Sequence, residues 1–460
     1  MYLEVADAFS KAPPPTQSGR GLAAVELYSG AGGMSLGLAE AGFEILRAYD
    51  HSAAAVAAYN RNIGYHAVAA DLTNMATMIS QLVALRPDLV AGGPPCQDFS
   101  SAGPRAEGDR ANHTRIFACY VSCIGPEWFI MENVSRARNS DAWKDARAML
   151  SRAGYGMSEM VLDASFYGVP QKRKRFIVIG RRGERDNFMD ASIRNAAAPE
   201  PMPLRALFGS SIGDHFYSHP RAADRRGVWS VDGPGPTVRN ARRPQPRSYE
   251  PHPNDSNFAE AQAIYMRPFF DGRGVWSLDE SAPAIVRTSR EKPRQSYLDK
   301  PHHGDPSPAS TAYVLTQSDV SLIQGFPVSW DWSGSLSRDV DQMIANAVPP
   351  PLARILGSEI LKRHFGESSP EVPGNFGQWL AKTGKRPQVV ANVKWRAKQA
   401  WQLLGGRDLR CRGAEALALE EAMSREGLPC AKKSDFRRAL RDFRDWQENV
   451  SSKRGRHPAR

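Results

Sequence analysis

Short apolar runs alternate with helical segments from Ala23 to about Gly180, and this alternation constrains the fold more than any other feature. Strands that alternate with helices form βαβ units and a parallel sheet. We therefore expect an α/β fold with a doubly wound, Rossmann-like sheet, which takes a nucleotide-type ligand at the carboxyl ends of its strands. The expected strands lie at 23–28, 43–49, 66–68, 88–91, 128–131 and 176–179.

A glycine-rich turn follows the first of these runs and is expected to form part of the ligand site. Without Cβ atoms at Gly30 and Gly33, the backbone can approach a ligand closely, and the N-terminus of the following helix favours polar or anionic groups. Asp50 ends the second run, where a carboxylate accepts hydrogen bonds from ribose hydroxyls. Asp71 follows the third, where it would meet an adenine amino group. The turn has no Walker-type lysine, which argues against a phosphate-cleaving enzyme.

One cysteine, Cys96, lies behind Pro94 and Pro95 on the loop after the run at 88–91. The prolines fix φ and stiffen the loop, so we expect the thiol to be held out and not packed as a small hydrophobe. Glu132 follows the next apolar run and would lie at the same edge of the sheet. In a dry pocket its carboxyl group would have a raised pKa and would donate a proton to a ring nitrogen.

A basic segment at 168–175 precedes the last apolar run. Its arginines alternate, so Arg173 and Arg175 are expected to point to one face. Both would steer a polyanion or a base carbonyl toward the thiol of Cys96.

Residues 181 to about 310 differ in texture and contain a repeat. The tetrapeptide Gly-Val-Trp-Ser occurs at 227–230 and again at 274–277, and the match continues to Ser-Tyr pairs at 248–249 and 296–297. Two copies are too few for a solenoid, so we expect two related β-rich modules in one small domain. A duplicated structural hairpin and a paired device for reading DNA both fit this pattern.

The positive charge of the chain is concentrated at its C-terminal end. The net charge is +11, and residues 375–460 hold 20 basic and 9 acidic side chains, which leaves 1–374 formally neutral. Such an extension is expected to meet a polyanion, and a solubilising tail is the alternative. An amphipathic helix capped by Ser434 is expected over 436–446. A small helical core is further indicated by Trp379, Trp395 and Trp401.

The five cysteines are scattered and form neither a disulfide framework nor a zinc motif, so no metal site is expected. Cys119 and Cys123 are spaced for one side of a helix, and we expect them to pack in the core. Residues 1–20 have no apolar centre, so they do not resemble a signal peptide. Nowhere do about eighteen apolar residues run together, which excludes a membrane span. We expect a soluble, cytoplasmic, nucleoid-associated protein in a reducing compartment.

With these segments in this order, the chain resembles the DNA (cytosine-5)-methyltransferase family of the bacterial restriction-modification type. The resemblance spans roughly residues 23–180 and 311–355. It rests on the family's first motif, the Pro-Cys, Glu-Asn-Val, Gln-x-Arg-x-Arg and Gln-Gly-Phe-Pro motifs, and the last motif. They lie at 26–33, 93–100, 132–134, 171–175, 324–327 and 346–350.

The resemblance implies a mechanism on double-stranded DNA. The target cytosine is flipped out of the duplex, the Cys96 thiolate adds to C6 with Glu132 at the N3/N4 edge, and C5 then takes the methyl group of S-adenosylmethionine. By family position, Arg175 would contact the base O2 and Arg173 would support the catalytic loop. The implied site of the methyl donor is lined by Tyr28, Ser29, Gly30, Gly33, Asp50, His51, Asp71, Leu72, Asn346 and Val348.

Three positions depart from the family pattern: Tyr28 replaces the usual Phe, Asp50 a common Glu, and Ala345 the usual Gly before the last motif. The first two keep the needed shape and charge. An RNA methyltransferase on the same catalytic domain would carry a Cys-Phe-Thr signature, which this chain lacks. A binding module that has lost catalysis would be damaged at Cys96 or Glu132, and both are present.

The resemblance also implies a domain organisation. Sequence recognition is expected from the target-recognition domain, where arginines, Asn240 and Thr288 would read base edges. We expect a monomer that works beside a companion restriction endonuclease; the sequence does not indicate the target site. The expected parts are a flexible segment (1–20), the catalytic domain (21–180), the target-recognition domain (181–310), a return to the catalytic domain (311–367) and a basic helical extension (375–460).

Overall fold

The computed structural model describes residues 21–95, 112–203, 205–208, 316–367, 372 and 374–454, with short stretches between 215 and 314. Cys96, Asn240, Thr288 and residues 1–20 lie outside the described residues. The chain divides into two compact units. Unit 1 comprises Met1–Ala153, Glu159–Gly180 and Ile193–Ser358; unit 2 comprises Gly154–Ser158, Arg181–Ser192 and Glu359–Arg460.

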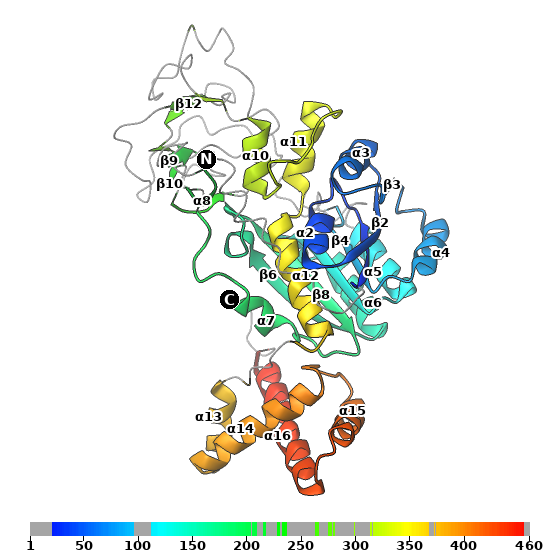
Figure 1. Ribbon diagram of the computed structural model, residues 1–460, viewed down its shortest axis with the longest axis vertical. Coiled ribbons are helices and arrows are strands. Elements are labelled where there is room, and N and C mark those ends of the chain that lie inside the picture. The colour runs from blue at the N-terminus through cyan, green and yellow to red at the C-terminus, as the bar shows by residue number, and fades with distance from the viewer. Residues whose placement is uncertain are drawn as a thin grey trace. The chain divides into compact units, whose positions relative to one another are not determined.

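A seven-stranded sheet forms the centre of the family-like part of the chain (Figure 1). Its order is β3-β2-β1-β4-β5-β8-β6, and β1 pairs in parallel with both β2 and β4. The strand order therefore reverses between β1 and β4, which confirms the expected doubly wound, Rossmann-like topology. The strands are β1 (Ala23–Leu27), β2 (Glu44–Asp50), β3 (Ala67–Ala69), β4 (Leu89–Gly92), β5 (Trp128–Val134), β6 (Tyr155–Asp163) and β8 (Lys174–Arg182).

Every apolar run that was predicted as a strand is found in this sheet, and β6 is an addition. β6 was not predicted because Gly156, Ser158 and Glu159 interrupt its apolar pattern. The helices of unit 1 follow the strands in alternation. They are α2 (Gly33–Ala41), α3 (Ala53–Asn62), α4 (Met75–Leu85), α5 (Asn112–Ile124), α6 (Asp141–Arg152), α8 (Arg205–Phe208), α10 (Gln317–Gln324) and α11 (Ser337–Asn346), with 3-10 turns at Ser135–Asn139 and Ala164–Phe166.

Helix α2 lies beside α12 (Pro350–His364), which returns to the sheet late in the chain (Figure 1). Gly37 makes this close packing possible, because a Cβ atom there would lie 2.3 Å from the carbonyl oxygen of Pro350 and 2.6 Å from the Cβ of Ala353. Helix α2 ends at Gly42, whose φ of 112° is the left-handed cap conformation that favours glycine. The N-terminal and late segments thus share one packed layer.

The repeated tetrapeptide forms a strand in both copies. β10 (Val228–Ser230) pairs antiparallel with β9 (His215–Tyr217), and β13 (Val275–Ser277) pairs antiparallel with β12 (Ala263–Tyr265). A third strand pairs with each hairpin: β14 (Asp279–Glu280) with β9, and β15 (Tyr313–Val314) with β12. The remaining short strands of the chain are β7 (Gln171–Lys172) and β11 (Gly235–Pro236).

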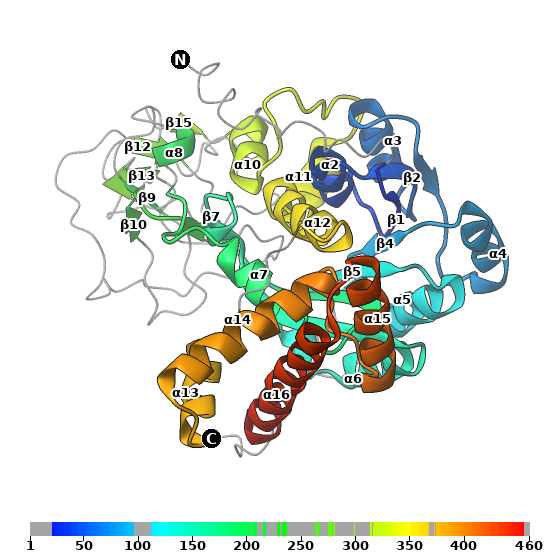
Figure 2. The same cartoon turned by 60° about the horizontal axis from the view of Figure 1, so that its bottom comes forward.

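Unit 2 contains the helices of the C-terminal extension, packed on an apolar core (Figure 2). Trp401, Phe443 and Trp446 are buried in this core, which agrees with a helical extension. The helices are α13 (Gly374–Lys382), α14 (Pro387–Leu403), α15 (Arg412–Arg425) and α16 (Cys430–Arg454), and the unit also holds α7 (Asp190–Asn195) up to Ser192.

Three expectations for single residues were wrong. Ser434 does not cap a helix, because α16 already begins at Cys430 and the Lys433 N–H donates to the Pro429 carbonyl. Trp395 does not join the core and is 59% exposed. Cys123 is exposed, and Cys119 is only half-buried.

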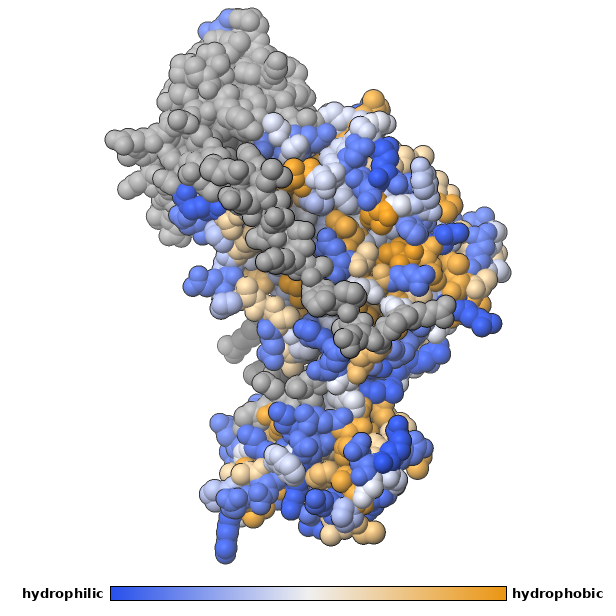
Figure 3. Space-filling view, in the orientation of Figure 1, coloured by the Kyte–Doolittle hydropathy of each residue, from blue (hydrophilic) through white to orange (hydrophobic). Residues whose placement is uncertain are grey.

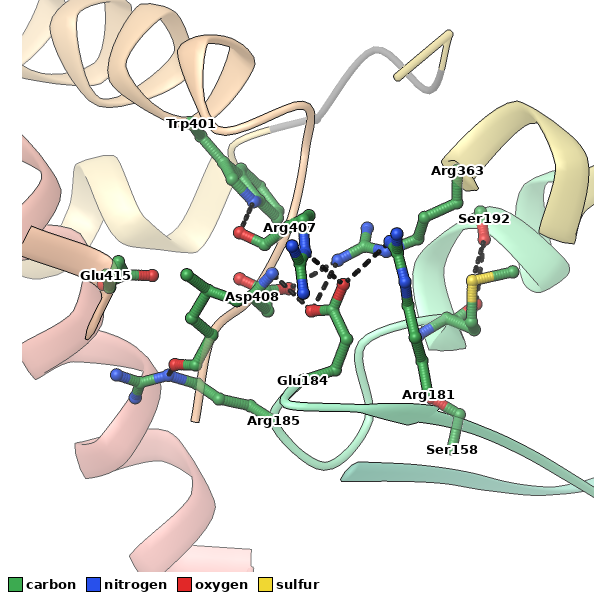
Figure 4. Close-up of polar contacts among 12 residues, drawn as sticks. Ser158, Arg181, Glu184, Arg185, Ser192, Arg363, Trp401, Arg407, Asp408 and Glu415 are labelled. Carbon is green, nitrogen blue, oxygen red and sulfur yellow. Dashed lines mark hydrogen bonds and ion pairs between the residues drawn. The ribbon is translucent and has the colours of Figure 1, made fainter. Parts of the chain in front are cut away.

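A cluster of buried charges lies within unit 2 (Figure 4). Glu184 has no exposed surface and is paired with Arg181 at 3.3 Å, Arg363 at 3.3 Å and Arg407 at 3.7 Å. The backbone N–H of Asp408 also donates to Glu184. The turn after β8 therefore supplies an acid that is shared by arginines from β8, from the end of α12 and from the extension.

Two further acids, Asp408 and Glu415, extend the cluster through Arg444. Arg444 on α16 is 1% exposed, forms an ion pair with Asp408, and contacts Glu415 at 2.8 Å. Its guanidinium also lies over the ring of Trp401, with 5.3 Å from Cζ to the centroid. Buried charges of this kind are tolerated only when each is paired.

The substitution Glu184→Gln keeps the side-chain shape but removes the charge at the centre of the cluster. We expect it to lower the free energy of unfolding by about 3–5 kcal/mol, because the buried Arg181 and Arg363 would lose the acid that they share. The measurement is urea unfolding followed by tryptophan fluorescence. The control Glu448→Gln removes an exposed partner of Arg412 and should cost less than about 1 kcal/mol. Equal effects of the two substitutions would contradict a structural role for the cluster.

Candidate active site

The ligand end of the sheet is organised by Asp50, the last residue of β2. Its Oδ2 accepts the N–H of Gly30 at 2.8 Å, and its Oδ1 accepts the N–H of Ser52 at 2.9 Å. The carboxylate is buried to 8% exposure and thus fixes the glycine-rich loop against the start of α3. Each carboxylate oxygen retains a lone pair that can accept a further hydroxyl.

The glycine-rich loop itself is strained and open. Tyr28 has a φ of 58° and Gly30 a φ of 54°, both in the left-handed region. A Cβ atom on Gly30 would meet no described atom within 4 Å, so the described part of the chain leaves space beside this backbone. The buried Ser29 between them donates its N–H to the Tyr49 carbonyl at 3.0 Å. The loop therefore offers accessible backbone at the carboxyl edge of β1.

A buried carboxyl group supports this loop from within the sheet. Glu26 on β1 accepts hydrogen bonds from both the N–H and the hydroxyl of Ser35 on α2. Burial raises the pKa of Glu26 to about 8, helped by the charge of Asp50 and opposed by the Ser35 bonds. Glu26 is therefore protonated at neutral pH and ties α2 to β1 as a neutral group.

The last motif lies directly against the first. A Cβ atom on Gly33 would be 2.3 Å from the carbonyl oxygen of Val348, so the two backbones approach as closely as glycine permits. Val348 is buried, whereas Asn346 is exposed. The structure thus brings Gly30, Gly33, Asp50 and Val348 to one region, as the resemblance implied.

Arg173 holds the last motif in place. Its guanidinium is 1% exposed and donates to the carbonyls of Ala345 at 3.1 Å and Ala347 at 3.0 Å. Two side-chain amides make a second connection to this motif. The Gln171 amide donates to the Gln324 side-chain oxygen at 2.9 Å, and the Gln324 amide donates to the Ala347 carbonyl at 2.7 Å. The contact at Ala345 uses the backbone carbonyl, which a glycine would supply equally.

Arg175 has a different partner. Its Nε lies 2.8 Å from Oε1 of Glu132, and the side chains are 13% and 10% exposed. Alternation along the sequence predicted a shared face for Arg173 and Arg175, but one guanidinium contacts the last motif and the other contacts Glu132. Glu132 lies near the end of β5, where a Cβ atom on Gly93 would be 3.3 Å from its Oε2.

The loop that carries the cysteine starts at this place. The Asn133 amide donates to the Pro94 carbonyl at 3.3 Å, and the Asn133 Oδ1 accepts the N–H of Val134. The Pro-Pro segment is therefore fixed beside the Glu-Asn-Val motif. Cys96 is two residues beyond Pro94 and lies outside the described residues.

The remaining residues of the implied donor site lie around the same strand ends. His51 is exposed, with Nδ1 3.4 Å from Oδ1 of Asp50. Asp71 is exposed and accepts the N–H and the hydroxyl of Thr73, which lowers the pKa of its carboxyl group. Leu72 is buried, and its carbonyl accepts the hydroxyl of Tyr120 at 2.8 Å.

One contact of this site was not indicated by the sequence. The hydroxyl of Tyr28 lies 3.2 Å from Nδ1 of His113, and their rings meet edge to face at 5.5 Å. His113 is the second residue of α5 and has no motif around it. Only the meeting of the β1 loop with α5 identifies it.

Comparison with known proteins identifies the class. A sequence profile of the C-5 cytosine-specific DNA methylase family matches residues 22–362. The chain belongs to this family, and it is a DNA (cytosine-5-)-methyltransferase. The resemblance drawn from the motifs is thereby confirmed.

Relatives match over most of their own length. The Type II methyltransferase M.HgiDI of Herpetosiphon aurantiacus is 38% identical over 338 residues, which cover 73% of this chain and 93% of that protein. M.HindV of Haemophilus influenzae is 35% identical, covering 73% and 95%. A crystal structure of S. pombe Dnmt2 methyltransferase aligns with a TM-score of 0.49 at 20% identity, covering 74% of this chain and 98% of that one.

The substitution Glu26→Gln tests the neutral carboxyl group. The unfolded chain releases this proton near the ordinary pKa of 4.5 and the folded chain near 8, so wild-type stability should fall as the pH rises between these values. Glutamine keeps an acceptor for Ser35 without the proton, so the variant should lack this part of the decline. The measurement is the urea midpoint from pH 5 to about 8.5. Glu44→Gln, exposed on β2, is the control, and parallel profiles for wild type and Glu26→Gln would contradict the assignment.

Proposed function

We propose that this enzyme transfers a methyl group from S-adenosylmethionine to C5 of a cytosine flipped out of a specific double-stranded DNA sequence, through a covalent adduct of Cys96. The observation that carries the proposal is the pairing of Glu132 with Arg175 at the strand end where Asn133 fixes the Pro94 backbone. This places an acid and a guanidinium beside the start of the cysteine loop. The family membership supports the same chemistry.

The residues present fit the methyl donor. The open space beside Gly30 admits a ligand against bare backbone, and the fixed carboxylate of Asp50 stands at a strand end, where ribose hydroxyls are bound in such sheets. We propose that Tyr28, Ser29, Gly33, His51, Asp71, Leu72, Asn346 and Val348 complete the lining. When bound, the donor supplies an electrophilic methyl group.

We assign the steps of methyl transfer to residues of the chain. The Cys96 thiolate forms a bond to C6 of the base, while Glu132 holds a proton at N3, so that the ring accepts the electron pair and C5 becomes nucleophilic. After C5 has gained the methyl group, its proton leaves to a base, the C6–S bond breaks and the thiolate is regenerated. Arg175 orients Glu132 and is placed to contact the base O2, and Arg173 holds the last motif.

The thiolate requires assistance at neutral pH. A free cysteine has a pKa near 8.5, so about a few per cent is ionised at pH 7. We propose that the arginines of the Gln-x-Arg-x-Arg segment favour the thiolate by their charge. We further propose that the hairpins formed by β9–β10 and β12–β13 belong to the part that recognises the DNA sequence.

The biological setting is also part of the proposal. Relatives that match most of their length are Type II methyltransferases, which supports a modification enzyme of a restriction-modification system with a companion endonuclease. We propose that it acts as a cytoplasmic monomer. Among the described residues, no helix is long and apolar enough to span a membrane, and no cluster of His, Cys, Asp and Glu is arranged to hold a metal ion.

The variant Cys96→Ser should abolish methylation, because a hydroxyl group is far less ionised than a thiol and adds poorly to C6. The measurement is base-resolution sequencing of 5-methylcytosine in a methylation-free host. Wild type should methylate one short motif, and the control Cys123→Ser, at an exposed cysteine, should do the same. Methylation by Cys96→Ser would exclude the covalent adduct.

The variant Glu132→Gln should lower kcat by roughly 10²–10⁴-fold, the usual contribution of a positioned general acid. Single-turnover transfer of labelled methyl groups to DNA at saturating donor measures this loss. The matched control is Glu159→Gln, which removes the partner of Arg147 away from the strand end. The role of Glu132 is refuted if its variant is as active as this control.

A further inference from the structure

The C-terminal extension has no counterpart in the family match. That match ends at residue 362, and relatives that are covered to 93–95% of their length leave about a quarter of this chain unmatched. The helices α13 to α16 nevertheless form an ordered bundle with its own apolar core. Methyl transfer as proposed above assigns no task to this bundle.

The bundle uses most of its acidic side chains internally. Of the acids between 375 and 460, only Glu421 and Glu426 lack an ion pair among the described residues. For example, Asp442 pairs with Lys385 and Asp435 with Arg396. The cations without an ion pair in this part of the structure are Lys382, Arg386, Lys394, Lys398, Arg425, Lys432, Arg438 and Arg441. The net positive charge of the extension is therefore at its surface.

Helix α14 combines such cations with an exposed aromatic ring. Trp395 is 59% exposed and lies at the middle of the solvent face of α14, although its edge meets Phe436 at 6.3 Å between centroids. Lys394 and Lys398 flank it on one side, separated by one helical turn. On the other side of Trp395, Asn392 is exposed and Gln399 is half-buried, and the Gln399 amide donates to Gln402 at 2.7 Å. We call the set Asn392, Lys394, Trp395, Lys398 and Gln399 the α14 surface.

The chemistry of the α14 surface fits a phosphate backbone better than a protein partner. The centres of protein interfaces are depleted in charged residues, lysine among them, whereas here one indole stands among lysines and amides. Lysine, asparagine and glutamine side chains are common donors to DNA phosphates. The visible face of the bundle carries hydrophilic side chains with hydrophobic ones among them (Figure 3).

We propose that the α14 surface binds the sugar-phosphate backbone of duplex DNA without regard to sequence. Lys394 and Lys398 each neutralise a phosphate, Asn392 and Gln399 donate hydrogen bonds to phosphate oxygens, and the indole of Trp395 packs against the sugars. The extension thereby gives the enzyme a second DNA-binding site, which is separate from the site that recognises the target cytosine. The choice of duplex DNA as ligand rests on the proposed function.

The test uses the full-length enzyme and a fluorescent duplex built only of A·T pairs, which contains no cytosine. The variant Lys394→Gln/Lys398→Gln should bind it about tenfold more weakly at about 0.1 M salt, and the slope of log Kd against log salt should fall by about 2, because two phosphate contacts are lost. The matched control, Arg425→Gln/Arg438→Gln, removes two unpaired cations from α15 and α16. It should change both quantities much less.

Two further variants separate folding from binding. Lys394→Arg/Lys398→Arg keeps the charges and should bind like wild type, and Trp395→Ala should weaken binding several-fold with an unchanged salt slope. Circular dichroism checks that each variant is folded. The proposal is overturned if the glutamine pair binds like wild type, or if it and the control lose affinity equally, since bulk charge would then explain the effect.

Methylation of a cytosine-containing target distinguishes this proposal from the proposed function. The glutamine pair should raise KM for DNA and leave kcat within about twofold of wild type, because the α14 surface is not part of the catalytic chemistry. A wild-type enzyme that methylates its target but shows no affinity for the A·T duplex would refute the α14 surface alone. A wild-type enzyme that binds the duplex but methylates nothing would instead refute the proposed function.

Discussion

The buried guanidinium of Arg173 is the contact on which the candidate site depends. It joins the start of β8 to the carbonyls of Ala345 and Ala347, residues that lie more than 170 positions later in the chain. These carbonyls belong to the C-terminal end of α11, where helical carbonyls have no partner within the helix. Because the guanidinium donates to them, the last motif is held close to Gly33 by a side chain that lies far away in the sequence.

The two units stabilise buried polar groups in different ways. In unit 1, the charged guanidinium of Arg173 and the amide of Gln324 donate to backbone carbonyls, and Glu26 is kept neutral by burial. In unit 2, Glu184 and Arg444 are part of a network of ion pairs. Such a network is strongly destabilised when one partner is lost. The buried cluster of unit 2 is therefore sensitive to a single charge substitution.

Local patterns in the sequence were sufficient to predict the sheet and the residues at the ends of its strands. Apolar runs and glycine turns depend on neighbours along the chain, so β1 to β5, Gly30 and Asp50 were placed correctly. Long-range partners were not predictable. The separate contacts of Arg173 and Arg175, and the bond between Tyr28 and His113, arise where segments distant in sequence meet.

The wrong predictions for the extension also arose because contacts between segments distant in sequence could not be predicted. Trp395 was expected in the core because tryptophan is usually buried, but its position on α14 faces away from the apolar stripe that ends with Trp401. Ser434 was read as a cap from its residue type, yet Pro429 accepts the first helical bonds and α16 begins a turn earlier. A periodic pattern alone does not define where a helix begins.

Unit 2 is assembled from three separate stretches of the chain, two of which lie inside the region shared with the family. The extension is thus not a module that could be transplanted by joining it to the end of another methyltransferase. A recipient would also need the turn with Glu184 and the first residues of β6, or Arg407 of the graft would lose the acid with which it pairs. Without the extension, Glu184 would keep its ion pair with Arg181 but would lose Arg407 and the N–H of Asp408, so a fully buried acid would be left with fewer partners.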